Sequence, residues 1–403
     1  MKKKKLAIVN QRYGLEVNGG SEYYTRILAE HLLEQYDVEV LTTCARDYDT
    51  WDNYYEEGVD EINGVSVRRF RTDKSRDLKK FKRLDRMRKY LPFFSRKMEK
   101  KWVEEQGPYC PACIRYIENH GDEYDVFIFV TYLYYLTVMG LEKVADKSIL
   151  IPTAHDEPFL KMQLYKALFE KPRGYFFNAE EEKKLVYETF GTHYIPCVTG
   201  GIGIEVPDRT DKEGFRKKHG LGKYIVYVGR IDYGKNCQQL FEYFARYQER
   251  KKTDLKLVLM GKEMIEAPKR DDVLSLGFVS EEEKYDGMSG AEFLVLPSQY
   301  ESLSIVVLDS MKLEVPVVVN GKSPVLKDHC QKSKGGLYYE SYEEFEEAAD
   351  FLLLHREERA RMGKNGRKYV DAHYRWESIL DGLNGLINKC IVRKGEGVDG
   401  REN

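Results

Sequence analysis

Short apolar runs of three to six residues alternate with longer amphipathic stretches along most of this 403-residue chain. That alternation is typical of buried parallel strands joined by helices, so the sequence predicts an α/β fold. We expect strands at residues 6–10, 38–42, 65–70, 126–131, 149–153, 175–178, 194–198, 224–228, 255–259, 273–276, 293–296 and 317–319.

A glycine cluster interrupts this alternation near the middle of the chain. Gly200, Gly201 and Gly203 precede a charged stretch at residues 205–218, after which the strand pattern restarts. The length also favours two domains over one. We therefore predict domains at residues 1–203 and 204–375. The tail at residues 393–403 is rich in glycine and charge, and we expect it to be disordered.

The segment 294–320 carries the most specific chemical signal. An apolar strand stops at Pro297-Ser298, Glu301 follows at its carboxyl edge, and Ser302–Met311 has helical apolar spacing. Open α/β sheets bind ligands at this edge. The amides of Ser302, Leu303 and Ser304 would then open a helix and favour an anion such as a diphosphate. Glu301 and Asp309, two helical turns apart, would face one extended ligand.

This segment resembles the signature of retaining glycosyltransferases of family 4, which have the GT-B fold. The resemblance implies two Rossmann-like, doubly wound domains facing each other across a cleft, with a last helix at residues 376–392 crossing back to the first domain. The second acid of the signature holds the donor ribose in the family. Here that position is Asp309, one methylene shorter than the family's Glu.

A second motif, Y-V-G-R-I-D-Y-G-K-N at residues 227–236, places two cations after a buried strand. Arg offers a planar fork and Lys a point charge, and both suit a diphosphate. The motif resembles the family pattern G-R-L-x-x-x-K-G, except that Asn236 replaces the last glycine. By this resemblance, Arg230 and Lys235 neutralise the donor diphosphate as it leaves.

Three further positions enter the predicted site chiefly by resemblance. Gly19 and Gly20 lie where the family has a glycine pair over the donor phosphates and the acceptor, and glycine lets backbone approach a ligand closely. His155, just after a strand, resembles the family histidine that contacts the donor sugar. The backbone of Val279 lies in a stretch that resembles the loop meeting the nucleobase.

Together these motifs predict a retaining glycosyltransferase that moves a sugar from a UDP- or GDP-linked donor to an acceptor hydroxyl. The resemblance implies no cofactor and no metal. The setting would be bacterial-type surface glycan or glycolipid assembly, and the acceptor a glycan, a glycolipid or a small molecule. Two alternatives stay open: a sugar-nucleotide epimerase of the same fold, and a non-catalytic partner subunit. A nicotinamide dehydrogenase is disfavoured because residues 11–21 lack G-x-G-x-x-G.

Composition narrows the cellular setting. The net charge of −2 argues against a general polyanion binder, and seven scattered cysteines suit a reducing cytoplasm. No run is long and apolar enough to predict a transmembrane helix. Cys110 and Cys113 form a lone C-x-x-C, which we interpret as structural. We interpret the D-x-D at residues 47–49 as part of a surface loop.

One stretch departs from the overall charge balance. Residues 74–102 carry thirteen Lys or Arg against three Asp or Glu, with apolar residues at helical spacing. A basic amphipathic helix predicts a peripheral contact with an anionic membrane surface, or an anionic acceptor site. An ordinary solvated helix is the alternative. A nucleic-acid partner is disfavoured because no nucleic-acid-binding motif accompanies the stretch.

Overall fold

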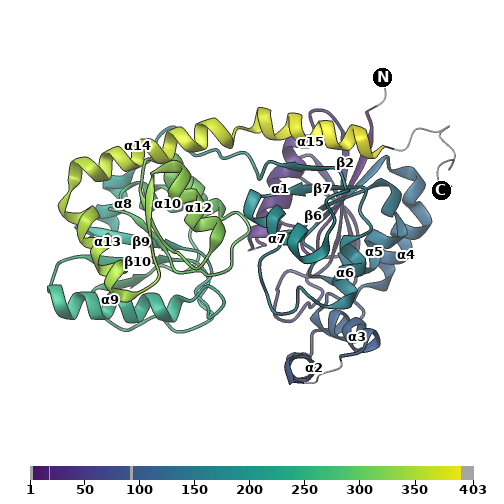
Figure 1. The fold of residues 1–403 in the computed structure, drawn as a ribbon, viewed down its shortest axis with the longest axis horizontal. Coiled ribbons are helices and arrows are strands. Elements are labelled where there is room, and N and C mark those ends of the chain that lie inside the picture. Colours follow the sequence, from purple (N-terminus) through teal and green to yellow (C-terminus); the bar gives the residue numbers. More distant parts are fainter. Residues whose placement is uncertain (1–2, 18, 91–93, 392–403) are drawn as a thin grey trace. The chain divides into compact units, whose positions relative to one another are not determined.

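The computed structural model describes residues 3–17, 19–90 and 94–391, and the chain folds into two compact units (Figure 1). One unit comprises the residues up to Ile202 together with those from Ile379 onward, and the other is Gly203–Ser378. Each unit has its own sheet, wholly or mainly parallel, with helices packed on it. The predicted tail at 393–403 lies outside the described residues.

The first unit is built on an eight-stranded sheet with the order β3-β4-β2-β1-β5-β6-β7-β8. All neighbouring pairs are parallel except β3 and β4, which are antiparallel. The strands are β1 (Lys5–Val9), β2 (Asp37–Thr43), β3 (Gly58–Ile62), β4 (Val65–Phe70), β5 (Val126–Val130), β6 (Ser148–Ile151), β7 (Gly174–Phe177) and β8 (Cys197–Thr199). The central strands β1, β5 and β6 are buried along almost their whole length.

Helices and short 3-10 turns connect these strands, and a helix that follows the last strand of the chain also packs on this unit. The helices are α1 (Gly20–Leu32), α2 (Leu78–Tyr90), α3 (Arg96–Gln106), α4 (Pro111–His120), α5 (Tyr135–Gly140), α6 (Gln163–Phe169), α7 (Glu180–Phe190) and α15 (Trp376–Cys390). The 3-10 turns are η1 (Gly121–Glu123), η2 (Leu141–Lys143) and η3 (Ala145–Lys147). α15 packs on this unit from Ile379 onward, where Asn384 accepts a hydrogen bond from the Tyr36 hydroxyl at 2.9 Å.

The second unit has a six-stranded sheet with the order β11-β10-β9-β12-β13-β14, and every pair is parallel. The strands are β9 (Tyr224–Val228), β10 (Lys256–Met260), β11 (Val273–Ser275), β12 (Leu294–Leu296), β13 (Val317–Asn320) and β14 (Gly336–Tyr339). The helices are α8 (Lys212–His219), α9 (Cys237–Lys251), α10 (Glu281–Ser289), α11 (Ile305–Lys312), α12 (Pro324–Ser333), α13 (Tyr342–Leu354) and α14 (Arg356–His373).

Both sheets reverse their strand order beside the first strand of the unit. In the second unit the chain moves from β9 to β10 and β11, and then returns to place β12 on the other side of β9. In the first unit β5 takes the equivalent place beside β1. The α/β prediction with two doubly wound sheets is confirmed. Two strands were not predicted: β3, which is exposed and charged, and β14, which contains only four residues.

Glycines allow α14 to pack closely on the turn between α11 and β13. A Cβ at Gly363 would lie 2.0 Å from the Glu314 carbonyl oxygen, whereas a Cβ at Gly385, in α15, would meet no atom within 4 Å. Both glycines have a helical backbone conformation. They differ in how closely other atoms pack against them, which makes them suitable for comparison.

We expect Gly363→Ala to lower the free energy of unfolding by roughly 1–3 kcal/mol, because the added methyl group forces the helix away from the turn. Gly385→Ala is the matched control, and we expect it to be neutral or to stabilise by about 0.5–1 kcal/mol through helix propensity. Urea unfolding of both variants measures the difference. Equal effects of the two substitutions would contradict the close packing.

Candidate functional site

An ion pair joins the loops that follow β9 and β12, the strands between which the order of the second sheet reverses. Lys235 Nζ lies 2.6 Å from Glu301 Oε1, and 28% of the Lys235 side chain and 11% of the Glu301 side chain are exposed. Doubly wound sheets bind their ligands outside this reversal, where the loops diverge. The pair therefore marks the candidate site of this unit.

The backbone beside this pair is crowded. Gly229 and Gly261, at the ends of β9 and β10, have φ values of 146° and 147°. A Cβ at Gly261 would lie 1.9 Å from the Gly229 carbonyl oxygen. The two loops thus run closer together than a side chain permits, and only glycine fits at Gly261.

The turn between Arg230 and Lys235 is ordered by Asp232. Its carboxylate lies 3.4 Å from Arg230 Nη2 and accepts a hydrogen bond from the Lys235 amide at 2.7 Å. Asn236 has φ 58° and ψ 31°, in the left-handed region, which Asn tolerates better than most residues. Asn236 therefore adopts a backbone conformation that the family's glycine at this position would also favour.

The helix of the signature begins three residues later than predicted. α11 starts at Ile305, and Ser304 caps it with φ 68° and ψ 77°, which is not a helical conformation. The open amides of the first turn therefore belong to residues from Ile305 onward, and the prediction that Ser302, Leu303 and Ser304 open the helix is wrong. The Ser304 hydroxyl is buried and, among the described residues, has no hydrogen-bond partner.

Asp309 lies in α11 and has a different partner from Glu301. It is 3% exposed, and its Oδ2 lies 3.5 Å from Lys284 Nζ on α10. Burial raises the pKa of Asp309 to about 6, while the Lys284 ammonium acts to lower it. Val279 is half-buried, directly before the Ser280 cap of α10.

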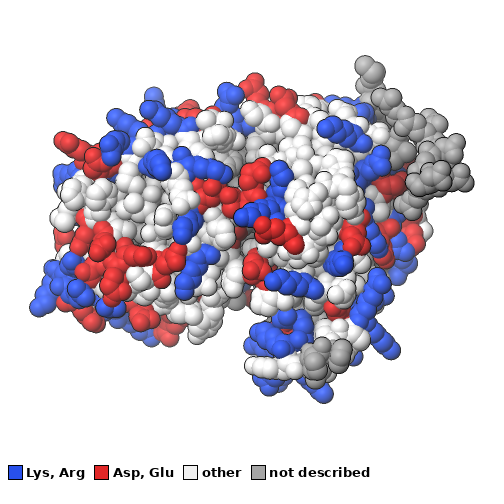
Figure 2. Space-filling model, in the orientation of Figure 1, with Lys and Arg blue, Asp and Glu red and all other residues white. Residues whose placement is uncertain are grey.

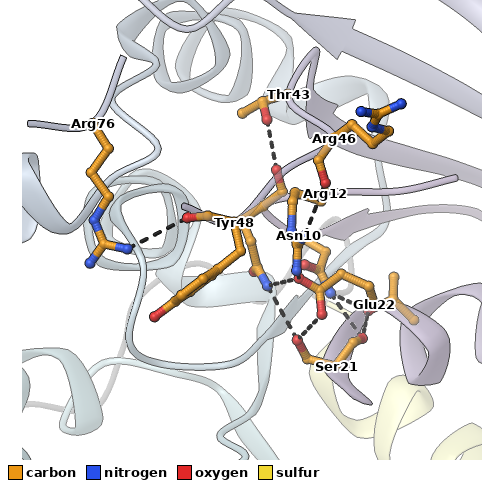
Figure 3. A network of polar contacts seen from close by, with 10 residues as sticks. Asn10, Arg12, Ser21, Glu22, Thr43, Arg46, Tyr48 and Arg76 are labelled. Carbon is orange, nitrogen blue, oxygen red and sulfur yellow. Dashed lines mark hydrogen bonds and ion pairs between the residues drawn. The ribbon is translucent and has the colours of Figure 1, made fainter. Parts of the chain in front are cut away.

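In the first unit, a buried ion pair supports the glycine loop after β1 (Figure 3). Arg12 Nη2 lies 2.5 Å from Glu22 Oε1, and the two side chains are 6% and 5% exposed. Burial alone would raise the pKa of Glu22, but Arg12 and hydrogen bonds from Ser21 and Gln11 hold it below its usual value. A Cβ at Gly19 would lie 2.1 Å from Glu22 Oε2, so the network requires glycine there.

Gly20 differs from its neighbour. It is the first residue of α1, and a Cβ there would meet no atom within 4 Å. The position therefore has open space around it, so packing does not explain why it is occupied by glycine.

His155 follows β6 in a loop held by the carboxyl groups of half-buried Glu157 and buried Glu182. His155 Nδ1 lies 3.0 Å from Glu157 Oε1, and Glu157 Oε2 accepts a hydrogen bond from the Tyr132 hydroxyl at 3.2 Å. Glu182, in the first turn of α7, accepts hydrogen bonds from the amides of Ala154 and Asn178, both at 2.6 Å. Burial raises the pKa values of Glu157 and Glu182 to about 8 in each case.

The predicted residues therefore fall into two groups. Gly19, Gly20 and His155 belong to the first unit, and the remaining predicted positions belong to the second. Arg12, Glu22, Glu157 and Glu182 were not predicted as parts of the site. Arg12 and Glu22 carry opposite charges on either side of the glycine loop, and this pattern could have identified them from the sequence. Glu182 resembles an ordinary helix-start glutamate in the sequence.

The C-x-x-C cysteines lie in the core of the first unit. Cys113 is fully buried, and burial raises the pKa of Cys110 to about 12. Over residues 3–17, 19–90 and 94–391, no three His, Cys, Asp or Glu side chains are grouped so that they could hold a metal ion.

Part of the chain matches a known family. Residues 209–369 match the family described as glycosyl transferases group 1. The alpha-D-kanosaminyltransferase of Streptomyces kanamyceticus is 31% identical over 190 residues, which is 43% of this chain and 48% of that protein. A Campylobacter jejuni relative, the N-acetylgalactosamine-N,N'-diacetylbacillosaminyl-diphospho-undecaprenol 4-alpha-N-acetylgalactosaminyltransferase, is 36% identical over 105 residues, 24% of this chain and 27% of that protein.

The matches thus span about half or less of these curated relatives. Among solved structures, Anabaena HepE in complex with UDP and glucose has a TM-score of 0.70 at 12% identity. The match covers 96% of this chain and 99% of that one. At this identity the likeness concerns the fold, which is GT-B, as predicted.

The pH dependence of stability tests the environment of Glu157. Its pKa is about 8 in the folded chain against an ordinary value of 4.5, so the folded state binds the proton more tightly than the unfolded state. Stability therefore falls as pH rises from about 5 to 8, by up to about 1.4 kcal/mol per pH unit.

Glu157→Gln removes this titration, so its stability relative to the wild type should increase steadily across that pH range. Glu188→Gln, on the exposed face of α7, serves as the control and should follow the wild type. Thermal unfolding at several pH values measures both. Parallel curves for wild type and Glu157→Gln would show that Glu157 ionises normally.

Proposed function

We propose that this chain, a glycosyltransferase of group 1 by the domain at residues 209–369, moves a sugar from a nucleotide-diphospho-sugar to an acceptor hydroxyl with retention of configuration. The donor is of UDP or GDP type, and the acceptor belongs to surface glycan or glycolipid assembly. The Lys235–Glu301 ion pair at the strand reversal carries the proposal, because it places a cation and a carboxylate where such sheets bind ligands.

The donor diphosphate lies against Arg230, Lys235 and the start of α11. A diphosphate is a stronger partner for an ammonium than one carboxylate, so it draws Lys235 away from Glu301. Glu301 is then available to accept hydrogen bonds from hydroxyls of the donor sugar. One exchange of partners thus couples diphosphate binding to sugar binding.

Transfer breaks the bond between the anomeric carbon and the diphosphate oxygen. Arg230 and Lys235 stabilise the charge that develops on the leaving diphosphate. The acceptor oxygen bonds to the same face of the anomeric carbon, and its proton passes to the departing phosphate. The reaction needs no cofactor and no metal.

The rest of the donor lies along α10 and α11. Asp309 accepts hydrogen bonds from the ribose hydroxyls, with Lys284 favouring its ionised form. The backbone of Val279 meets the nucleobase. In the first unit, His155 contacts the donor sugar, and the loop at Gly19 and Gly20 serves the phosphates and the acceptor.

The basic stretch at residues 74–102 makes a peripheral contact with the anionic inner face of the membrane. The acceptor lies at that surface. Lys and Arg side chains gather over α2 (Figure 2), where Lys79, Lys82, Arg83 and Arg86 are exposed. Lys80 differs because it pairs with Glu105 at 2.6 Å. None of the described helices has the length and apolarity to span a bilayer. The name of the Campylobacter relative specifies a diphospho-undecaprenol acceptor, which supports a lipid-linked one here.

The first test removes both diphosphate cations. Each charge-assisted contact contributes roughly 1.5–3 kcal/mol, so Arg230→Ala with Lys235→Ala should weaken binding of UDP or GDP at least a hundredfold. Calorimetric titration of both nucleotides measures the change. The control is Arg246→Ala with Lys251→Ala on α9, which removes the same charge from the same unit. Unchanged affinity in the first variant would reject the diphosphate site.

The second test concerns the acceptor side. We expect the chain to sediment with vesicles containing anionic lipid at low salt, since each basic residue near such a surface contributes on the order of 1 kcal/mol and salt screens it. Replacing Lys79, Lys82, Arg83 and Arg86 by Gln should abolish sedimentation and leave nucleotide affinity intact. Replacing Lys217, Lys218, Lys223 and Lys252 by Gln is the control. If the wild type does not sediment with the vesicles, the acceptor is soluble and α2 is an ordinary solvated helix.

A further inference from the structure

A buried histidine binds the backbone of the signature loop. His329, on α12, is 2% exposed, and its Nε2 lies 2.8 Å from the Leu303 carbonyl oxygen. Its Nδ1 lies 3.1 Å from the Tyr369 hydroxyl on α14. Both ring nitrogens therefore have partners from other elements of the second unit.

The direction of these hydrogen bonds follows from the donors and acceptors present. A carbonyl oxygen only accepts, so His329 Nε2 carries the proton that it donates to Leu303. Burial lowers the pKa of His329, so the ring is neutral near pH 7 and Nδ1 accepts from the Tyr369 hydroxyl. The Tyr369 oxygen, 3.4 Å from the Tyr374 hydroxyl, then accepts in that contact.

The loop that His329 holds is strained. Leu303 lies between Glu301 and Ser304, and Ser304 has φ 68° and ψ 77°, a conformation that residues other than glycine rarely adopt. Such backbone persists only where its surroundings hold it, and it clusters at functional sites. The buried Ser304 hydroxyl, which has no partner within the described chain, lies in the same loop.

Tyr374, at the other end of this series of hydrogen bonds, lies in one of the two segments through which the chain passes from one unit to the other. The Tyr374 carbonyl accepts a hydrogen bond from the Ile204 amide at 2.9 Å. Ile204 lies at the entry to the second unit, and Tyr374 lies four residues before its exit at Ser378. A Cβ at Gly203 would lie 2.3 Å from the Trp376 ring, so the two crossing segments pack tightly.

We propose that His329 is a positioning residue that fixes the Glu301–Ser304 loop for donor binding and links that loop, through Tyr369 and Tyr374, to the crossing segments. This inference rests on the proposed function, since it assigns the donor to that loop. His329 does not touch the donor and takes no part in the chemistry. Binding of a nucleotide at the loop would thereby steady the backbone at Ile204.

The experiment compares variants of the full chain by calorimetry with UDP and GDP and by amide hydrogen exchange. His329→Leu removes both hydrogen bonds, and we expect at least a tenfold loss of nucleotide affinity and at least tenfold faster exchange of the Leu303 and Ser304 amides. His329→Gln keeps an amide donor near the position of Nε2, so affinity should return to within about threefold of wild type.

Tyr369→Phe separates the two roles. It removes the hydroxyl between His329 and Tyr374, so affinity should change less than threefold. Nucleotide binding should then no longer slow exchange at the Ile204 amide as it does in the wild type. Tyr338→Phe, at a half-exposed position on β14, is the matched control and should behave as wild type.

The outcomes separate this inference from the proposed function. If the wild type binds neither nucleotide, the proposed donor site is wrong, and exchange at Leu303 and Ser304 still tests whether His329 holds the loop. If the wild type binds and His329→Leu binds equally well with unchanged exchange, the positioning role is wrong. If His329→Leu does not fold, Tyr369→Phe decides the link, which nucleotide protection of Ile204 equal to wild type would overturn, and nucleotide affinity of His329→Gln below one tenth of wild type would overturn the role of the Nε2 donor.

Discussion

The reversal of strand order between β9 and β12 is the constraint on which the candidate site depends. Because the chain leaves β9 in one direction and returns to β12 on its other side, the loops after these strands diverge and leave room at their carboxyl ends. Lys235 and Glu301 come from those two loops and meet at 2.6 Å. Neither residue would have this partner in a sheet wound in a single direction.

Buried ionisable groups hold the loops around both strand reversals. In the first unit, Glu22 pairs with Arg12 behind Gly19, and Glu182 accepts from the amides of two neighbouring loops. In the second unit, Asp309 pairs with Lys284. Burying a charge costs free energy unless its partners are well placed, and the ion pairs and hydrogen bonds of these groups offset that cost while they connect neighbouring loops.

Two regions beside the carboxyl edge of the first unit's sheet contrast in their chemistry. The carboxyl ends of β1 and β6 carry polar networks with restricted solvent exposure, centred on buried Glu22 and half-buried Glu157. Helix α2, which follows the carboxyl end of β4, instead presents exposed cations over a thin apolar face in which Leu84 is buried. Networks with little solvent exposure suit precise positioning of a small ligand, whereas exposed cations suit a diffuse anionic surface.

The sequence by itself determined the alternation of strands and helices and the positions of Arg230, Lys235, Glu301 and His155 after strands, because apolar periodicity and local motifs are properties of neighbouring residues. It did not determine that α11 starts at Ile305, since the left-handed Ser304 depends on long-range packing. His329 and Leu303, which meet there, are 26 residues apart. Likewise, the sequence shows Arg12 and Glu22 on either side of the glycine loop, but only the fold brings them together and buries them. Burial and pairing across distant segments are decided only by the tertiary structure, because they depend on which surfaces the packed elements exclude from water.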